Sequence, residues 1–225
     1  MSHPPLYYAT KNKHTDAMRL LLECGADPNY VDMISENSIN ESLLHLAVNN
    51  GNVDSVQLLI DYGADIHVCD RFGNSLFHCA AHYGHIDMLE FLISKGANMN
   101  ATEIDWGKHA MHIAAYYGSI DSMQWLLDHD IDVDIKDGWG HTPLHWAAYR
   151  RKIDAVRFLI SKGANINNMN KHGENILFDA AISEDQQCKE LINILLDHGA
   201  KHVYKYRSYG PDPNEIIRKV ILSRK

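Results

Sequence analysis

The chain has 225 residues, of which 45% are hydrophobic and 22% charged, a composition that is ordinary for a globular protein. Its formal net charge of −8 is uneven, because residues 201–225 hold seven Lys and Arg against two acids and leave the rest of the chain at −13. An acidic body argues against DNA or RNA as the main ligand, since phosphate binding needs a dense basic face.

Neither a membrane span nor a leader is expected. No apolar run approaches the roughly 20 residues that cross a bilayer, and the first residues, MSHPPLYYATKNK, lack the apolar core of a signal peptide. The four cysteines form no CxxC pair, which predicts free thiols. Three of them fall in predicted helices or helix ends, where we expect them to pack as small hydrophobes. A cytoplasmic location follows, with the nucleus as the alternative.

A histidine recurs along the chain at a nearly constant interval. It stands at His45, His78, His112 and His145, with Phe178 next, so the intervals are 33, 34, 33 and 33. A Gly-Ala pair that follows each histidine keeps the same period, except where Asp130 and Ile131 replace it. Two independent markers with one period indicate an array of structural repeats.

The predicted elements of one repeat are clearest in residues 137–169. Thr142 is placed as a helix N-cap with Pro143 at the first helical position. A second helix carries an apolar stripe that includes Val156 and Leu159, and Gly163 ends it. One such pair of helices cannot bury its apolar faces alone, so we expect neighbouring pairs to stack.

These segments resemble the ankyrin-repeat family. The resemblance covers residues 5–202 and rests on SLLHLAVNNGNVDSVQLLIDYGADIH (42–67), SLFHCAAHYGHIDMLEFLISKGANMN (75–100), HAMHIAAYYGSIDSMQWLLDHDIDVD (109–134) and HTPLHWAA (141–148). It implies an all-α solenoid of six stacked repeats, each a β-hairpin followed by two antiparallel helices. We predict a single domain over 1–225, with repeats at 1–32, 33–69, 70–102, 103–136, 137–169 and 170–202 and a C-terminal cap and tail at 203–225.

Several stretches depart from the regular repeat. The polar insertion Met33–Glu41 is interpreted as a long hairpin finger, which is either a tolerated loop or a carrier of contacts. The last repeat inserts residues around Ser183–Lys189. Beyond it, Pro213 is predicted to open a final helix whose Ile216, Ile217, Val220 and Ile221 cover the end of the array.

No constellation of residues indicates catalysis or metal binding. His78, Cys79, His82 and His85 are close in sequence, but the resemblance explains His78 as the histidine of the repeat, which bonds the backbone and the helix-start hydroxyl. It accounts for His85 as well, and only His82 is unexplained. No nucleophile triad or phosphate loop is present. We therefore predict no enzyme activity, no metal and no cofactor.

Aromatic side chains recur at two other positions of the repeat. Phe72, Trp106, Trp139 and His172 precede the hairpin glycines at intervals of 34, 33 and 33. A second set follows the Ala-Ala of each first helix, and the resemblance places both sets on the concave side of the solenoid. The predicted partner-binding residues are Arg71, Phe72, His82, Tyr83, Trp106, Lys108, Tyr116, Tyr117, Trp139, His141, Tyr149 and Arg150.

The alternative for the tip aromatics is that they only stack against neighbouring tips and stiffen the array. Tyr, Trp and Arg are the residue types that anchor protein interfaces, which favours binding for the tyrosines that follow Ala-Ala. Trp125 aligns with core positions and is left out. Trp146 is expected to be half-buried between helices and to be a weak candidate.

The resemblance also implies a modification. In this family the asparagine that ends the loop after the second helix can be hydroxylated, and Asn100 and Asn167 match that position, each with a leucine eight residues earlier.

The leading hypothesis is a non-enzymatic, monomeric interaction module that binds a partner protein, as an inhibitor or adaptor. A narrower version is a pathogen protein directed at host signalling, acting in the host cytoplasm. The alternatives are a scaffold or regulatory part of a larger enzyme, a ubiquitin-ligase adaptor, and a nucleic-acid binder that uses the basic tail.

Overall fold

The computed structural model describes residues 3–33, 40–181, 185–202 and 212–224. The chain divides into two compact units, Met1–Asp105 (unit 1) and Trp106–Lys225 (unit 2). Within the described residues almost all regular structure is helical, as predicted. The boundaries of the six repeats and the single domain remain predictions.

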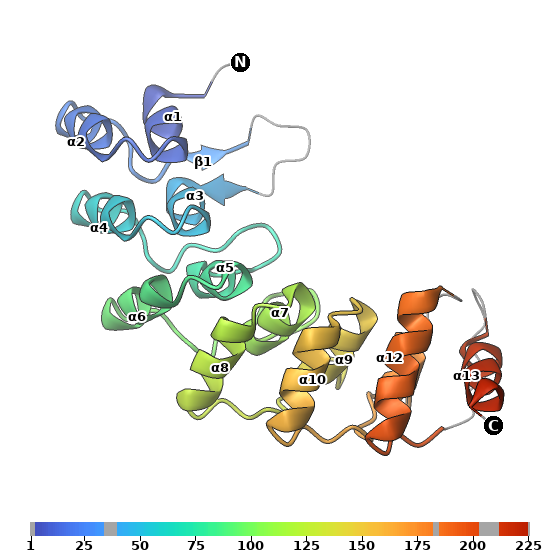
Figure 1. Ribbon diagram of the computed structural model, residues 1–225. Helices are drawn as coiled ribbons and strands as arrows, with labels where there is room; N and C mark the ends of the chain where they lie inside the picture. The colour runs from blue at the N-terminus through green and yellow to red at the C-terminus, as the bar shows by residue number, and fades with distance from the viewer. Residues whose placement is uncertain (1–2, 34–39, 182–184, 203–211, 225) are drawn as a thin grey trace. The chain divides into compact units, whose positions relative to one another are not determined.

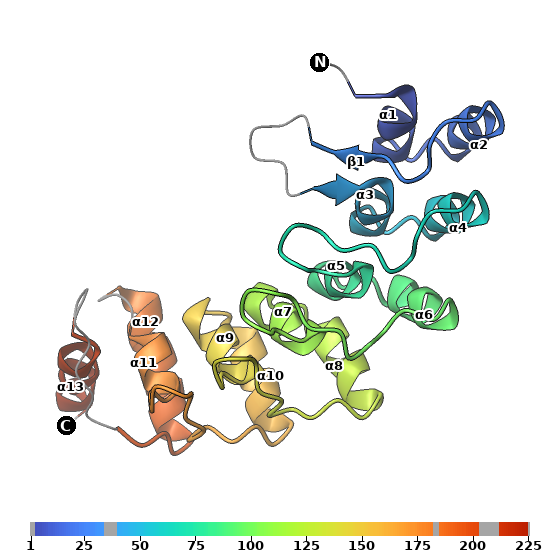
Figure 2. The same ribbon diagram turned by 180° about the vertical axis from the view of Figure 1, so that it is seen from behind.

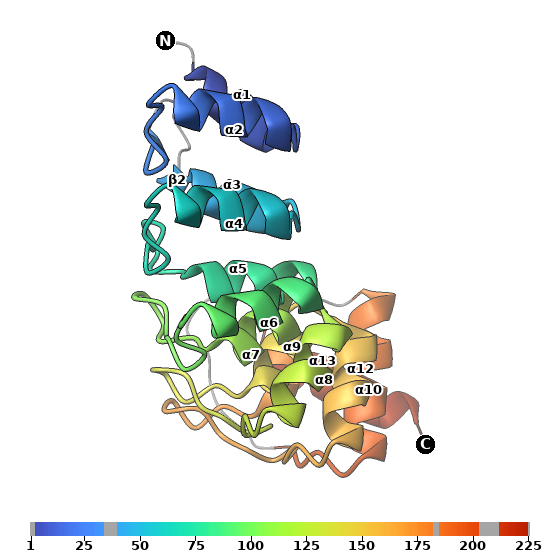
Figure 3. The same ribbon diagram turned by 90° about the vertical axis from the view of Figure 1, so that its left-hand side faces the viewer.

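Unit 1 contains three successive pairs of helices. One layer is formed by the first helices, in which α3 packs on α1 and α5 on α3, and a second layer by α2, α4 and α6 (Figure 1). Figure 3 shows the loops after α2 and α4 at the same end of these helices. The elements are α1 (Pro5–Lys11), α2 (Thr15–Glu23), β1 (Val31–Asp32), β2 (Glu41–Ser42), α3 (Leu43–Asn49), α4 (Val53–Asp61), α5 (Leu76–Tyr83) and α6 (Ile86–Ser94).

Unit 2 repeats the arrangement and adds a closing helix. Here α9 packs between α7 and α11, and α10 packs against α8 (Figure 2). The elements are α7 (Ala110–Tyr117), α8 (Ile120–Asp128), α9 (Pro143–Tyr149), α10 (Ile153–Ser161), α11 (Ile176–Ala180), α12 (Gln186–Asp197) and α13 (Pro213–Ser223). Among the described helices, none has the length and apolar character needed to cross a membrane.

The last helix, α13, confirms the predicted cap. Pro213 is its first residue, and the helix packs against both α11 and α12. Ile216, Ile217 and Val220 are buried, while Ile221 is half-buried. The final pair of helices therefore has its apolar side covered within the chain.

The hairpins are short. Strands β1 and β2 pair antiparallel with Val31 opposite Ser42, and two other hairpins close with single bridges, Cys69–Ser75 and Met169–Asn175. The insertion predicted at Met33–Glu41 starts directly after β1 and ends at Glu41, the first residue of β2, and its residues 34–39 are outside the described residues. So are residues 183–184 of the second predicted insertion and 203–211 of the basic tail.

The first helices α3, α5, α7 and α9 each begin with a cap that involves the recurring histidine. In α9 the hydroxyl of Thr142 and its backbone N–H both contact Nδ1 of His145, at 2.8 and 3.1 Å. Ser75 and His78 form the same pair in α5. In α7 the ring of His109 replaces the hydroxyl and accepts the N–H of Met111 at 3.2 Å. The cap thus survives the loss of the usual threonine.

At His45 and His112 the same histidine also bonds the next hairpin. Nε2 of His45 donates to the carbonyl oxygen of Asn74 at 3.2 Å, and Nε2 of His112 donates to that of Ile135 at 3.0 Å. With Nδ1 accepting and Nε2 donating, the ring is neutral. Burial lowers the pKa of His112 to about 4 and that of His145 to about 3, since desolvation penalises the charged ring.

Second helices end as the sequence predicts. Gly163 adopts a left-handed φ of 89°, which favours glycine. Asp130 takes the equivalent conformation with φ 62°. Ile131 is as buried as Ala164, the alanine of a regular pair, since both side chains are 8% exposed. The substitution in this repeat therefore preserves the geometry of the turn.

The expectation that three cysteines pack as small hydrophobes is wrong for one of them, Cys24. Cys188 is fully buried and Cys79 is half-buried, but Cys24 and Cys69 are exposed. Cys24 is the residue that ends α2, and Cys69 lies in a hairpin. Burial raises the pKa of the Cys79 thiol, so that thiol is unreactive at neutral pH.

The buried histidines predict loss of stability in mild acid. Folding holds His112 and His145 neutral, whereas an unfolded histidine titrates near 6.5, so below that pH the unfolded chain binds more protons. We expect the free energy of unfolding to fall by about 1.4 kcal/mol per pH unit for each histidine between pH 6 and 4.5. Urea unfolding at stepped pH measures the slope.

A matched pair of variants isolates the cause. His145→Gln should reduce the slope of unfolding free energy against pH by the share of one histidine, about 1.4 kcal/mol per pH unit. His172→Gln, at an exposed position, should leave the slope unchanged. An unfolding free energy that stays constant from pH 6.5 to 4.5 would contradict the assignment of neutral buried rings.

Candidate functional site

A buried acceptor side chain shapes each of the four hairpin tips between residues 70 and 174. Oδ1 of Asp137 accepts the backbone N–H groups of Trp139 and His141 at 2.9 and 2.8 Å. Asp70 holds Phe72 and Asn74 in the same way, and Asn170 holds His172 and Glu174. The residue two positions after the acceptor is thereby placed at the tip, which is where the aromatic side chains stand.

Sequence analysis missed these acceptors, although they keep the period. Asp70, Glu103, Asp137 and Asn170 recur at intervals of 33, 34 and 33, and each is at most 7% exposed. Glu103 accepts from Asp105 at 2.9 Å. A search for buried polar positions at the repeat interval would have found them.

Successive tips are joined by main-chain hydrogen bonds. The carbonyl oxygen of Phe72 accepts from Ile104 N at 2.9 Å, that of Trp106 from Gly138 N at 2.8 Å, and that of Trp139 from Lys171 N at 2.8 Å. These bonds run from one hairpin to the next and do not depend on the tip side chains. Within each unit, this ladder of hydrogen bonds holds the residues of successive tips in a row, as the sequence predicts.

Unit 1 holds four of the predicted partner-binding residues. The guanidinium of Arg71 lies 4.6 Å from the ring centroid of Phe72, a cation–π contact. The rings of His82 and Tyr83 stack at 4.1 Å, and Tyr83 is 48% exposed.

Unit 2 holds the other eight, and its aromatic rings form one continuous surface. Trp139 lies 6.0 Å from Trp106 on one side and 5.5 Å from His172 on the other. Tyr116 is 4.9 Å from Tyr117. We call the surface formed by Trp106, Tyr116, Tyr117, Trp139, Trp146 and Tyr149 the aromatic surface.

A large fraction of the surface of these rings stays exposed although they stack on one another. Trp106, Tyr117 and Tyr149 are each 43% exposed and Trp139 is 42% exposed. The tip aromatics therefore stack on their neighbours and still present large areas. The two interpretations offered by the sequence are compatible at Trp106 and Trp139, and the binding role itself remains a prediction.

Trp146, expected to be a weak candidate, lies at the centre of this surface. Its ring centroid is 5.7 Å from those of both Trp106 and Tyr116, and 6.0 Å from that of Tyr149. The indole N–H donates to Oδ2 of Asp137 at 2.9 Å, which fixes the ring. It is half-buried, as predicted, but it joins the tip aromatics to those of the first helices.

Trp125 behaves as a core residue. It lies in α8, is 7% exposed and stacks at 3.7 Å on His129, the residue that ends this helix.

Two cations lie on rings of the aromatic surface. The guanidinium of Arg150 is 4.6 Å from the centroid of Tyr116, and Nζ of Lys108 is 5.0 Å from that of Trp146. Such contacts use the negative ring face and contribute about 0.5–1 kcal/mol at exposed sites.

His141 connects the hairpin base to the neighbouring tip. Its Nδ1 lies 3.4 Å from Oδ2 of Asp137, and its Nε2 accepts from the amide of Asn170 at 2.9 Å. Desolvation lowers the pKa of His141, but the bond with Asp137 and the nearby carboxylates outweigh it and the pKa is raised. Desolvation raises the pKa of Asp137, but hydrogen bonds from His141 and Trp146 lower it further, and the resulting pKa is about 2.

The two candidate hydroxylation sites differ in their surroundings. The side chain of Asn167 donates to the carbonyl of Gly199 at 3.2 Å and accepts from Lys201 N at 2.9 Å. Asn100 is exposed, and its backbone N–H bonds Asn98. Hydroxylation stays a prediction at both.

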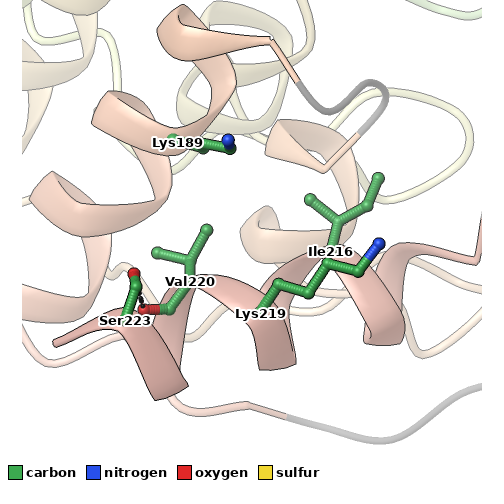
Figure 4. A pocket seen from close by; sticks show the side chains of 5 residues that line it. All are labelled: Lys189, Ile216, Lys219, Val220 and Ser223. Carbon is green, nitrogen blue, oxygen red and sulfur yellow. Dashed lines mark hydrogen bonds between the residues drawn. The ribbon is translucent and has the colours of Figure 1, made fainter. Parts of the chain in front are cut away.

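The structure describes one further hollow, between α12 and α13. Its volume is about 130 Å³, small against the roughly 300–1,000 Å³ of ligand pockets. Figure 4 shows its apolar residues Ile216 and Val220 beside Lys189 and Lys219, so it is a gap in the packing of the cap helix. Within the described residues, no group of three His, Cys, Asp or Glu side chains is arranged to hold a metal ion.

The double role of Asp137 yields a prediction. Asp137→Asn should preserve the tip, because Asn170 holds its own tip with Oδ1, but it replaces the acceptor of the Trp146 indole with an amide donor. We expect the free energy of unfolding to fall by about 1–3 kcal/mol, as for a buried donor left unsatisfied. The tryptophan emission should shift as Trp146 loosens.

Asp70→Asn is the matched control, since no indole bonds Asp70 among the described residues. It should shift the tryptophan emission less than Asp137→Asn does. Equal spectra for the two variants would show that Asp137 does not orient Trp146.

Comparison with known proteins agrees with this architecture. Two family models match, "Ankyrin repeats (3 copies)" over residues 44–137 and 132–206 and "Ankyrin repeats (many copies)" over residues 6–60. No curated protein matches the sequence. The crystal structure of the human ASB11 ankyrin repeat domain is similar, with a TM-score of 0.75 and 22% identity, over 99% of this chain and 98% of that one.

At 22% identity the likeness to that structure shows the fold alone. The family models, however, span most of the sequence, and the paired helices, histidine caps and hairpin ladder fit them. The chain therefore belongs to the ankyrin-repeat family.

Proposed function

We propose that this chain is a non-enzymatic module that binds a partner protein with the hairpin tips and first helices, the side that is concave in this family. Ankyrin repeats are in general protein-interaction modules. The observation that carries the finer proposal is the aromatic surface of unit 2, in which four rings are 42–43% exposed although each has ring or cation neighbours.

The surface suits binding for a physical reason. Its rings are held by Asp137, by the main-chain ladder and by each other, so little side-chain freedom remains to be lost on association. Large, rigid aromatic side chains are the typical anchors of protein interfaces. Arg71, Phe72, His82 and Tyr83 of unit 1 are proposed as further contacts.

An inhibitor or an adaptor would both use such a surface. The first would cover the active surface of its partner, and the second would leave that surface open while holding the partner elsewhere. The scaffold or regulatory part of a larger enzyme remains the alternative, and it would use the same surface toward a neighbouring domain.

The test compares partner capture by the native chain and by Trp106→Ala/Tyr117→Ala/Trp139→Ala. We expect the triple variant to lose its partners, with affinity weakened on the order of 100-fold or more, because interface anchors contribute about 2 kcal/mol or more each. Affinity capture followed by titration of the recovered partner measures this.

Tyr62→Ala is the control, as it removes a 38% exposed ring that follows α4, outside the proposed surface. It should bind as the native chain does. Circular dichroism and thermal unfolding must show that the triple variant is folded, and unchanged capture by a folded triple variant would overturn the proposal.

A further inference from the structure

We propose that the aromatic surface of unit 2 recognises an acidic peptide segment, in which carboxylates flank aromatic or aliphatic residues. This proposal rests on the proposed function and adds the chemistry of the partner. It is carried by the distribution of accessible charge in unit 2 and by the cations seated on the rings.

Unit 2 differs from unit 1 in its charge. Residues 106–225 contain 16 Lys and Arg against 15 Asp and Glu, a net charge of +1, whereas residues 1–105 contain 5 against 14, a net charge of −9. Seven of the 16 Lys and Arg of unit 2 lie in residues 201–225, so residues 106–200 carry nine Lys and Arg against 13 acids, a net charge of −4. The net charge of unit 2 therefore does not describe the surroundings of the aromatic surface, which depend on where the accessible charges lie.

Most of the exposed acids described in unit 2 lie on the second helices and the loops that follow them, while Asp185, Asp212 and Glu215 lie at the start of α12 and of α13. The former group includes Asp121, Asp128, Asp130, Asp132 and Asp154. The tips and first helices, residues 106–117, 137–150 and 170–181, contain three acids. Asp137 and Asp179 are 5% and 7% exposed, and Glu174 is half-buried and accepts from Asn170 at 2.9 Å.

Cations outnumber acids among the accessible charges on the tip and first-helix side, although Asp105, the residue before Trp106, is exposed as well. Arg150 and Lys171 are exposed, and Lys108 is half-buried. Lys171 donates one Nζ–H to the carbonyl oxygen of Gly138 at 2.6 Å, which places its ammonium beside the hairpin that carries Trp139. Two ammonium protons remain for a partner.

Arg150 is positioned for a carboxylate. Its guanidinium lies over Tyr116, and a guanidinium on a ring face keeps its N–H edges available for bidentate bonds. Among the described residues no ion pair involves Arg150, so this cation needs no internal carboxylate to be released before it can bind one.

The same cations disfavour a basic partner. A Lys or Arg from a partner would normally seek the faces of Trp and Tyr rings. Here Lys108 and Arg150 already occupy the faces of Trp146 and Tyr116, and they would repel a second cation. An acidic segment instead pairs with them while its apolar residues cover the exposed areas of Trp106, Trp139 and Tyr149.

The test selects peptides from a random 12-residue library displayed on phage, using the immobilised full chain, and the selected peptides are then measured on the native chain and on Trp139→Ala. We expect the selected peptides to contain at least twice the Asp and Glu of the unselected library. Their dissociation constants, measured by fluorescence anisotropy, should rise about tenfold between 50 and 500 mM NaCl, as ion pairs are screened.

Charge reversal identifies the cations. Arg150→Glu/Lys171→Glu should weaken the selected peptides about tenfold or more. Arg157→Glu/Lys162→Glu makes the same change of charge on exposed residues of α10 and the turn that ends it, and it should leave the affinity unchanged.

The outcomes separate this inference from the proposed function. Peptides without acidic enrichment that still lose binding with Trp139→Ala would overturn the acidic partner and keep the interaction surface. Peptides that bind Trp139→Ala as well as the native chain, or no selected peptides at all, would count against both. Tighter binding of a 20-nucleotide poly(dT) probe than of any acidic peptide would overturn the inference in favour of nucleic acid.

Discussion

The architecture depends on a neutral histidine that bonds in two directions. Nδ1 accepts from the start of a first helix, while Nε2 donates to the backbone of the following hairpin, as His45 does to Asn74 and His112 to Ile135. A helix start and the next hairpin are thus held to one rigid ring. The ring must be uncharged, because a proton on Nδ1 would face the N–H of the cap.

The aromatic surface is built on this frame with one addition that belongs to a single repeat. The acceptor at the base of each described hairpin tip bonds backbone N–H groups, but Asp137 has a second oxygen that receives the indole of Trp146. The corresponding positions in other repeats are Leu46, Cys79 and Ile113, which have no such donor. One substitution at a half-buried position has therefore connected the tips to the first helices.

Much of this could be predicted from the sequence, because a repeat period is a strong signal. The helix starts at Thr142 and Pro143, the turn at Gly163 and the cap helix that begins at Pro213 were all predicted from local chemistry. Asp130 and Ile131 could be placed by alignment alone, and the structure shows them in the conformation of the pair they replace.

The period did not predict the depth of side chains or their lateral contacts. It placed Cys24 at a helix end, but whether a residue there is buried depends on the turn that follows. It ranked Trp146 low because neighbouring repeats have smaller residues there, whereas the size of the indole and the reach of Asp137 determine its role. Buried acceptors such as Asp70 and Asn170 were not predicted, because the sequence alone does not tell a buried polar residue of a turn from an exposed one.

The ladder of main-chain bonds between hairpins has an evolutionary consequence. Since the carbonyl oxygens of Phe72, Trp106 and Trp139 provide the links, any residue that tolerates the turn can occupy a tip without loss of the link. Mutations at these positions can change what the surface recognises at little cost to folding. A lineage carrying this scaffold could thus follow a changing target by small steps, each of which leaves a foldable chain.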